Sequence, residues 1–118
     1  MGKTKSRIQE AAFHLFNLNG YSNVTIRNIA TELNMSSGNL NYHFRRREEI
    51  LEALYFDMVA VFDKRIDELG QKHISLKSIK DDMHHSLERM VAYRFFWTDL
   101  YHILRLNETI KAHFDQAY

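Results

Sequence analysis

The residues best suited to chemistry in this chain lie in one stretch, residues 36–47, which reads SSGNLNYHFRRR. Two serines and a glycine allow a backbone to approach a partner closely. The amides of Asn39 and Asn41 can donate and accept hydrogen bonds at the edges of DNA bases. Tyr42 and His43 can donate to phosphate oxygens, and the arginines that follow attract a polyanion with a strength that falls with salt. The order of residue types predicts contact with nucleic acid.

The flanking pattern predicts that two short helices position this stretch. One helix begins after Thr25, a candidate N-cap, and its apolar pattern ends at Asn34. The next begins after a second candidate cap, Ser36, and covers residues 37–44. Apolar residues flank each cap at hydrophobic-staple positions: Val24 with Ile29, and Met35 with Leu40. Two short helices joined by roughly three residues indicate a helix-turn-helix unit, whose second helix enters the major groove N-terminus first.

Apolar spacing predicts helices along the rest of the chain. A face from Ile8 to Phe16 indicates a first helix that stops near Asn19–Gly20, with Tyr21 packed back on the core. A long helix is expected from about residue 46 to residue 69, ended by Gly70, and another over 76–90 with its apolar side inward. Residues 91–106 are apolar on more than one side, which suggests a helix surrounded by others. With no proline and four glycines, the chain is predicted to be all-α.

Composition limits the class of protein. The chain has no cysteine and no apolar run of about 18 residues, so disulfides, thiolate metal sites and a transmembrane helix are not expected. No signal peptide is indicated, and a cytoplasmic protein fits best. Residues 1–50 hold seven lysines and arginines against four acidic residues, whereas residues 51–118 hold nine against eleven. Positive charge is therefore concentrated in the N-terminal part, where a polyanion would bind.

Catalysis and metal binding are not predicted. No Ser-His-Asp arrangement and no glycine-rich phosphate loop can be argued, so we expect no catalytic residues, no enzyme activity and no cofactor. Seven histidines raise the question of a metal. Asp81 and His85 share a helix face and His102 could approach them, but no metal-binding pattern is present and solvated histidines are the better interpretation.

The motifs of residues 6–56 resemble the TetR family of bacterial transcription regulators. The resemblance is carried by AAFHLFNLNGYSNVTIRNIA, LNMSSGNLNYHF and EEILEAL. It implies a three-helix DNA-binding head over residues 1–47, followed by a long connecting helix and a partial helical domain for effector binding and dimerisation over residues 48–118. Residues 57–118 look like the beginning of that second domain, and family members continue well past this length.

The resemblance also implies roles for individual residues. Thr25 is similar to a phosphate-binding cap, His43 to a phosphate contact, and Arg47 stands where the family usually has a phosphate-binding lysine. Two positions depart from the pattern: Asn41 replaces a tyrosine that anchors to the DNA backbone, and Arg46 replaces a common capping residue. The predicted DNA-binding set is Thr25, Arg27, Ser36, Ser37, Gly38, Asn39, Asn41, Tyr42, His43 and Arg47.

The function implied is a DNA-binding transcription regulator of the TetR type, most simply a repressor that responds to a small molecule. Double-stranded DNA, an unidentified effector and a second copy of the chain in a longer homodimer would be its partners. The alternative is a helical protein-interaction module that has lost DNA binding and docks through residues 91–106. Six side chains are predicted to touch the effector, although they could equally be core or a dimer patch: Met58, Phe62, Met83, Phe96, Trp97 and Tyr101.

Overall fold

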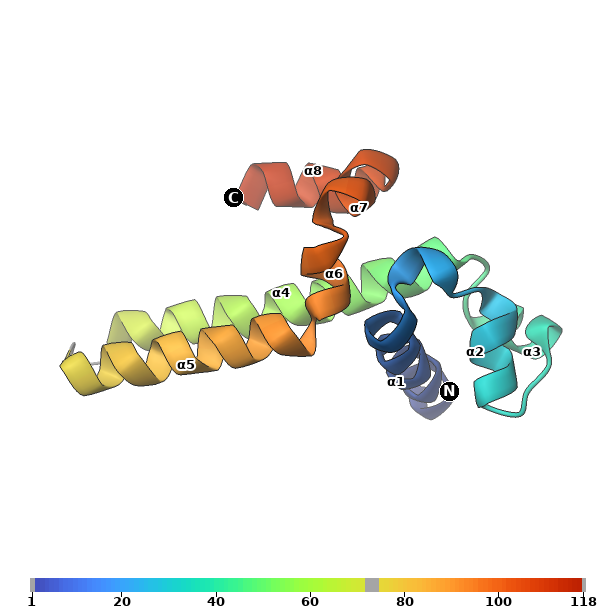
Figure 1. Ribbon diagram of the computed structural model, residues 1–118, viewed down its shortest axis with the longest axis horizontal. Helices are drawn as coiled ribbons and strands as arrows, with labels where there is room; N and C mark the ends of the chain where they lie inside the picture. The colour runs from blue at the N-terminus through green and yellow to red at the C-terminus, as the bar shows by residue number, and fades with distance from the viewer. Residues whose placement is uncertain (1, 72–74, 118) are drawn as a thin grey trace.

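The computed structural model describes residues 2–71 and 75–117, with the side chains of Ile66, Leu69 and Gln71 set aside. Within these residues all regular structure is helical, as predicted (Figure 1). The elements in chain order are α1 (Gly2–Asn19), the short 3₁₀ turn η1 (Tyr21–Asn23), α2 (Ile26–Glu32), α3 (Ser37–His43), α4 (Arg47–Gln71), α5 (Leu76–Ala92), α6 (Arg94–Thr98), α7 (Leu100–Leu106) and α8 (Glu108–Ala117).

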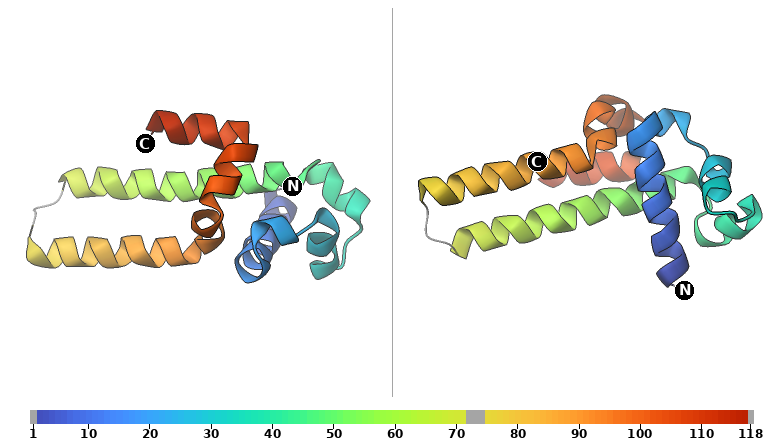
Figure 2. Two further views of the ribbon diagram at one scale, coloured as in Figure 1. Left: turned by 45° about the horizontal axis from the view of Figure 1, so that its top comes forward. Right: turned by 60° about the horizontal axis from the view of Figure 1, so that its bottom comes forward.

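The molecule is elongated, 52 × 29 × 25 Å. Helices α4 and α5 run antiparallel beside each other along the long axis in every view (Figures 1 and 2). Helices α1–α3 form a head at one end of α4. Helices α6–α8 turn back across the middle of α4, so that α8 lies above it (Figure 1).

Local signals in the head have the structural effects that the sequence predicts. Helix α1 ends at Asn19, just before Gly20, whose φ of 86° favours glycine. The Tyr21 ring packs edge-on against Phe16 with centroids 5.0 Å apart. The Thr25 hydroxyl caps α2 by accepting from the Asn28 amide, and the Asn28 side chain accepts from the Thr25 amide in return. The Ser36 hydroxyl caps α3 by accepting from the Asn39 amide at 3.0 Å.

One continuous hydrophobic cluster joins the head to α4, α6, α7 and α8. It contains Ile8, Ala12 and Phe16 from α1, Leu40 from α3, Ile50, Leu51, Leu54 and Tyr55 from α4, Phe95 and Phe96 from α6, Ile103 from α7 and Ile110 from α8. The predicted inward face of α4 is thus confirmed as far as Met58, while Phe62 is 39 % exposed and the side chains of Ile66 and Leu69 lie outside the described residues.

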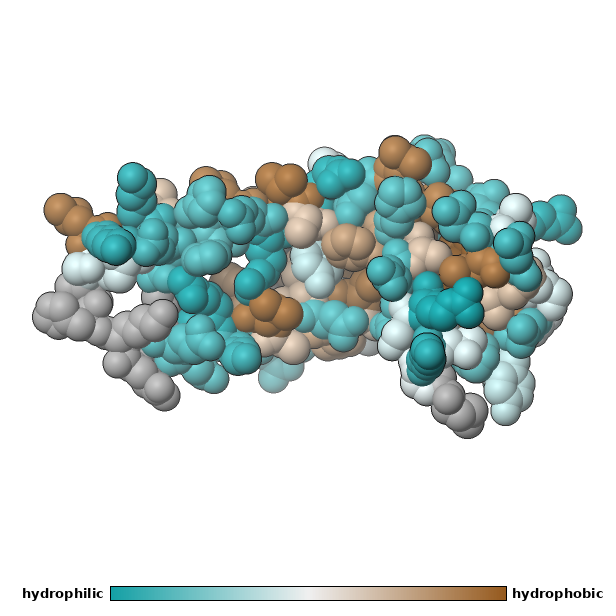
Figure 3. Space-filling model, turned by 90° about the horizontal axis from the view of Figure 1, so that it is seen from below, coloured by the Kyte–Doolittle hydropathy of each residue, from teal (hydrophilic) through white to brown (hydrophobic). Residues whose placement is uncertain are grey.

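Three sequence-based expectations are wrong. Gly70 does not end α4, because the helix continues through Gln71. Residues 91–106 form the end of α5 and two short helices instead of one helix, with non-helical backbone at Tyr93 and Asp99. The apolar side of α5 does not face a core: no described residue of this helix is buried, and these side chains are exposed: Leu76, Ile79, Met83, Leu87 and Met90. Apolar groups accordingly appear between hydrophilic ones at the surface (Figure 3).

Candidate nucleic-acid interface and ligand pocket

Helix α3 buries one side and leaves the other open to solvent. Leu40 is fully buried and Phe44, just after the helix, is 6 % exposed, and these two anchor it to the head. On the opposite side Tyr42 is 76 % exposed. Of the remaining predicted contacts on this element, Ser36, Gly38, Asn39 and Asn41 are exposed, and Ser37 and His43 are half-buried. Seven of the ten residues predicted to contact DNA therefore lie on α3 or at its N-cap, and five of these seven are exposed.

Gly38 lies on this accessible side. A Cβ atom built on Gly38 would meet nothing within 4 Å, and the residue sits inside an ordinary α-helix. Neither packing nor backbone conformation within the protein therefore requires glycine at this position. A requirement for glycine would have to come from a partner that approaches the backbone closely.

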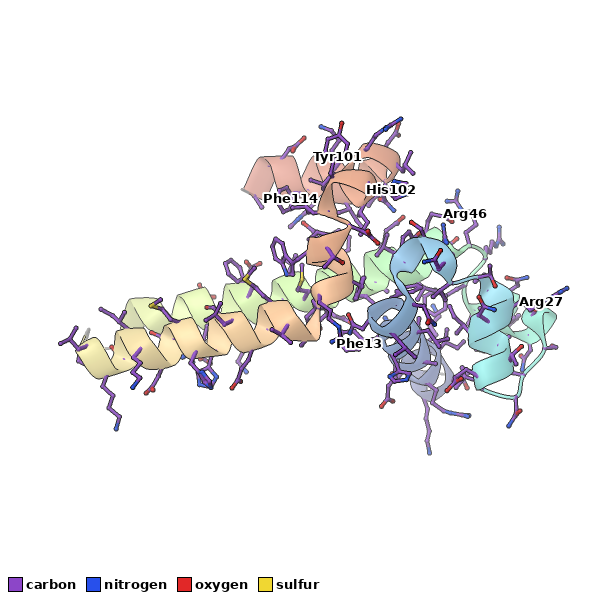
Figure 4. The ribbon with its side chains drawn as sticks, viewed as in Figure 1. Phe13, Arg27, Arg46, Tyr101, His102 and Phe114 are labelled. Carbon is purple, nitrogen blue, oxygen red and sulfur yellow. The ribbon has the colours of Figure 1, made fainter. Side chains whose placement is uncertain are left out.

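Basic side chains from three parts of the head surround α3. The Lys5 ammonium of α1 lies 5.4 Å from the centre of the Phe44 ring, at the C-terminal end of α3. Arg45 and Arg46 follow that ring and are exposed, with the Arg46 guanidinium 4.0 Å from Glu49. Thr25 and Arg27, at the start of α2, are exposed as well, and Arg27 and Arg46 mark the same end of the molecule (Figure 4). This end therefore offers cations to an anionic partner.

Arg47 has partners within the protein instead of projecting as a cation. Its Nη1 donates to the backbone carbonyl oxygens of Tyr21 at 3.2 Å and Val24 at 2.9 Å, and its guanidinium stacks 4.3 Å from the Tyr21 ring centre. Burial raises the pKa of Tyr21 above its usual value of 10.0, and the charge of Arg47 opposes part of that rise. Arg47 thus holds the turn before α2 against the start of α4. Its predicted phosphate contact remains a prediction.

A pocket of about 480 Å³ opens between α4, α5, α6 and α8. This volume is in the range of small-molecule sites. Most of its wall is apolar or aromatic, and the polar groups in the wall are few. The lining residues are Tyr55, Met58, Val59, Phe62, Arg65, His85, Ser86, Arg89, Met90, Trp97 and Phe114.

Only three of the six side chains predicted to touch an effector line the pocket. Met58, Phe62 and Trp97 line it, whereas Phe96 is buried in the core beside it and Met83 and Tyr101 are exposed outside its wall. Figure 4 shows Tyr101 on α7, away from α4 and α5. The sequence interpretation missed the other eight lining residues, among them Arg65, Arg89 and Phe114. Of these, Arg65 could have been found from the spacing, because it follows Met58 and Phe62 at intervals of about one helical turn.

Two polar contacts hold α8 over the pocket. The Tyr55 hydroxyl and Nδ1 of His113 are 2.7 Å apart, and they join α4 to α8. Asn107 Oδ1 accepts a hydrogen bond from the Ile110 backbone amide at 2.9 Å, which caps α8. Asn107 Nδ2 donates a hydrogen bond to the Glu52 carboxylate of α4 at 3.1 Å. Phe114, which follows His113, completes the wall on this side (Figure 4).

Neither a metal site nor a membrane span is found in the described part of the chain. In residues 2–71 and 75–117, no three histidine or acidic side chains are grouped so that they could hold a metal. Over the same residues, no helix is both long and apolar enough to cross a membrane.

Comparison with protein families identifies the chain. The family described as bacterial regulatory proteins, tetR family, matches residues 8–54, and the family described as bacterial transcriptional repressor, TetR, matches residues 57–118. The chain belongs to the TetR family. The boundary between these matches, near residue 55, lies inside α4, so the connecting helix belongs to both parts of a TetR-family chain.

Relatives of this TetR-family chain agree with that assignment. It is 28 % identical over 80 residues to the Bacillus subtilis (strain 168) protein named Probable HTH-type transcriptional regulator YttP. The matched segment covers 68 % of this chain and 38 % of that protein. A TetR-family transcriptional regulator from Marinobacter aquaeolei VT8 superposes with a TM-score of 0.90 at 27 % identity over 96 % of this chain and 56 % of that one.

A second solved structure comes from Saccharomonospora viridis and was determined in complex with choline. This protein, assigned as a transcriptional regulator, matches with a TM-score of 0.76 at 27 % identity over all of the present chain and 64 % of its own. The chain therefore spans less than two thirds of the length of each of these relatives.

Proposed function

We propose that this TetR-family chain is a sequence-specific DNA-binding regulator, a repressor whose affinity for DNA responds to a small molecule. The single observation that carries the DNA-binding part is the exposed side of α3, with its amides and Tyr42 flanked by Lys5, Arg45 and Arg46. Residues 1–47 would be the DNA-binding domain and residues 48–118 the part that binds the effector and dimerises. The protein would act on DNA in the cytoplasm, without catalysis.

Every predicted DNA contact except Arg47, which binds the turn before α2, has a role in this proposal. Ser36, Ser37 and Gly38 let the start of α3 approach the floor of the major groove, where Asn39 and Asn41 read base edges. Thr25, Arg27, Tyr42 and His43 contact phosphates and fix the register. Arg45 and Arg46 supply attraction that depends on salt. In a homodimer, two copies of α3 would enter successive major grooves on one side of the duplex.

The pocket beside α4 is proposed as the effector site. An effector changes DNA affinity only if it binds the conformation that cannot span two half-sites better than the one that can. Helix α4 suits this role because Met58 and Phe62 line the pocket, whereas Arg47 at its other end holds the turn before α2. The lever in this proposal is residues 47–69.

The DNA-binding proposal is tested with a mixed-sequence duplex and fluorescence anisotropy over a range of salt concentrations. Several phosphate contacts give a log–log slope of several units, and removing one phosphate-binding cation reduces the slope by about one. We expect Arg45→Ala and Arg46→Ala each to reduce the slope, while Arg105→Ala on α7, far from α3, leaves it unchanged. A weak, salt-independent response of the native chain would exclude DNA binding.

One observation favours the alternative, a protein-interaction module. Within residues 91–106, Val91, Tyr101 and Leu106 are each more than 60 % exposed. These apolar side chains would form the docking face if the chain had lost DNA binding. The salt titration separates the two functions, because a docking module without DNA binding gives no slope.

A further inference from the structure

The wall of the pocket contains basic side chains and no acidic ones among the described residues. The ionisable lining residues are Arg65, His85 and Arg89, together with the Tyr55 phenol. Among the residues that the structure describes, no aspartate or glutamate belongs to the lining. Apart from Ser86, the rest of the wall is apolar, and four aromatic rings contribute to the wall: Tyr55, Phe62, Trp97 and Phe114. A ligand that matches this wall has an apolar body.

The three basic groups differ in how far they are already neutralised. Arg65 forms ion pairs with Asp82 on α5 and, at 3.6 Å, with Glu68. His85 lies 3.9 Å from Glu88. Arg89 has no carboxylate partner among residues 2–71 and 75–117, although it stands in the wall of an apolar pocket. Arg89 is therefore the basic group at this wall whose charge remains to be matched.

We propose that the pocket takes an anionic amphiphile, a carboxylate on an aliphatic or aromatic body, with Arg89 holding the carboxylate. The planar guanidinium presents paired N–H donors that match a carboxylate. The aromatic rings and Met58 cover the apolar body. This inference rests on the proposed effector site and names the chemical class of its ligand.

A cation is the opposite alternative, because aromatic rings also attract quaternary ammonium groups. The related Saccharomonospora viridis protein was solved with choline. In this chain, a cation among the rings would lie beside the unneutralised Arg89, with no carboxylate in the wall to offset the repulsion. Charge therefore favours an anion here.

Arg89 also occupies a position where a basic residue can have a purely structural role. It lies in the last turn of α5, where a cation interacts favourably with the negative end of the helix dipole. A residue that served only this role would affect stability but would not make the pocket prefer one ligand charge over another. Charge preference is thus the property that separates the two roles.

The single tryptophan of the chain, Trp97, lines the pocket and reports occupancy by its fluorescence. The full 118-residue chain is titrated with decanoate, with neutral decanamide and with decyltrimethylammonium, each below its micelle concentration. We expect decanoate to bind roughly tenfold more tightly than decanamide, a typical gain for a charge-assisted hydrogen bond, and the ammonium to bind most weakly. The preference should shrink with added salt.

Variants attribute the preference to one residue. Arg89→Gln should bind decanoate and decanamide within about twofold of each other, Arg89→Lys should keep part of the preference, and Arg105→Gln, an exposed arginine outside the pocket, should behave as the native chain. Circular dichroism checks that each variant is folded. If Arg89→Gln unfolds, the ratio of decanoate to decanamide affinity is compared between Arg89→Lys and the native chain, and an unchanged ratio counts against the inference.

Three results would overturn the inference: tighter binding of the ammonium than of decanoate, a preference that survives in Arg89→Gln, or no Trp97 response to any of the probes. None of these results changes the salt-dependent DNA titration. Failure of the ligand class is therefore distinguishable from failure of the DNA-binding proposal.

Discussion

The side-chain oxygen of Asn17 in α1 accepts a hydrogen bond at 3.0 Å from the backbone amide of Phe95, 78 positions later in α6. The amide nitrogen of Asn17 donates to the Ala92 carbonyl oxygen at 2.8 Å. One carboxamide thus joins the head formed by α1–α3 to the backbone on both sides of the break between α5 and α6. Phe13 reinforces this junction, with its ring edge-on to Tyr93 at 5.0 Å and to Phe95 at 6.0 Å.

Asn17→Ala removes both hydrogen bonds and leaves the Phe95 amide without its acceptor. We expect a decrease of about 1–3 kcal/mol in the free energy of unfolding, measured by urea denaturation. Asn41→Ala is the matched control, because Asn41 is exposed and its side chain makes no hydrogen bond among the described residues. Equal stabilities of the two variants would show that the junction contributes nothing.

The same junction lies beside the pocket. Met90 before the break and Trp97 after it both line the pocket, so an occupant contacts the two segments that Asn17 joins to α1. We expect Asn17→Ala to reduce the effect of a pocket ligand on DNA affinity while the binding of that ligand, followed by Trp97 fluorescence, changes little. If the ligand changes the DNA affinity of this variant as much as that of the native chain, the effect passes through α4 alone.

Arg47 provides a second connection, between the start of α4 and the turn before α2. Arg47→Met removes two charge-assisted hydrogen bonds and the stacking on the Tyr21 ring, so we expect a decrease of about 2 kcal/mol in unfolding free energy. Arg45→Met, at an exposed neighbouring position, should change stability by less than about 0.5 kcal/mol. If the two variants reduce DNA affinity equally without a difference in stability, Arg47 acts as a phosphate contact instead.

These two connections mark the limit of what the sequence could predict. The caps at Thr25 and Ser36, and the turn at Gly20, depend on residues within three or four positions and were predictable from local rules. The acceptors of Arg47 lie 23 and 26 positions away, and the partners of Asn17 lie 75 and 78 positions away. Nothing in the spacing of either residue indicates its partner.

The second half of the chain was harder to predict for a related reason. Residues 91–106 are apolar on several sides, which hides the breaks at Tyr93 and Asp99 from a helical pattern. Helix α8 was not predicted, although Ile110 and Phe114 stand one helical turn apart and both pack on the core. The exposed apolar side of α5 shows the converse, because amphipathic spacing predicts a face but not what covers it.

Alkaline pH should destabilise the folded chain through Tyr21 and Tyr93. Burial raises the pKa of both phenols above 10.0, so the folded chain holds these protons more tightly than the unfolded chain. Their contribution to stability is therefore complete below the unfolded pKa, near pH 10, and is lost as pH rises through the higher folded pKa. Urea denaturation between neutral pH and about pH 11 should show a smaller decline in Tyr21→Phe than in the native chain.

Tyr42→Phe is the control for this pH dependence, because Tyr42 is 76 % exposed. This variant should decline with pH as the native chain does. A Tyr21→Phe profile parallel to the native one would contradict the assignment.

Asn107 tests whether α8 is fixed to α4 by hydrogen bonds or by apolar packing alone. It is 7 % exposed, its oxygen caps α8 at the Ile110 amide, and its nitrogen donates to Glu52. Asn107→Asp keeps the cap but sets a carboxylate against Glu52. We expect a decrease of about 1–3 kcal/mol in unfolding free energy at neutral pH, accompanied by a change in Trp97 fluorescence as α8 and Phe114 loosen from the pocket.

Adding Glu52→Gln removes the repulsion and supplies a donor, so the double variant should recover most of the stability. If Asn107→Asp alone is as stable as the native chain, the hydrogen bond to Glu52 does not hold α8, and the core residue Ile110 does.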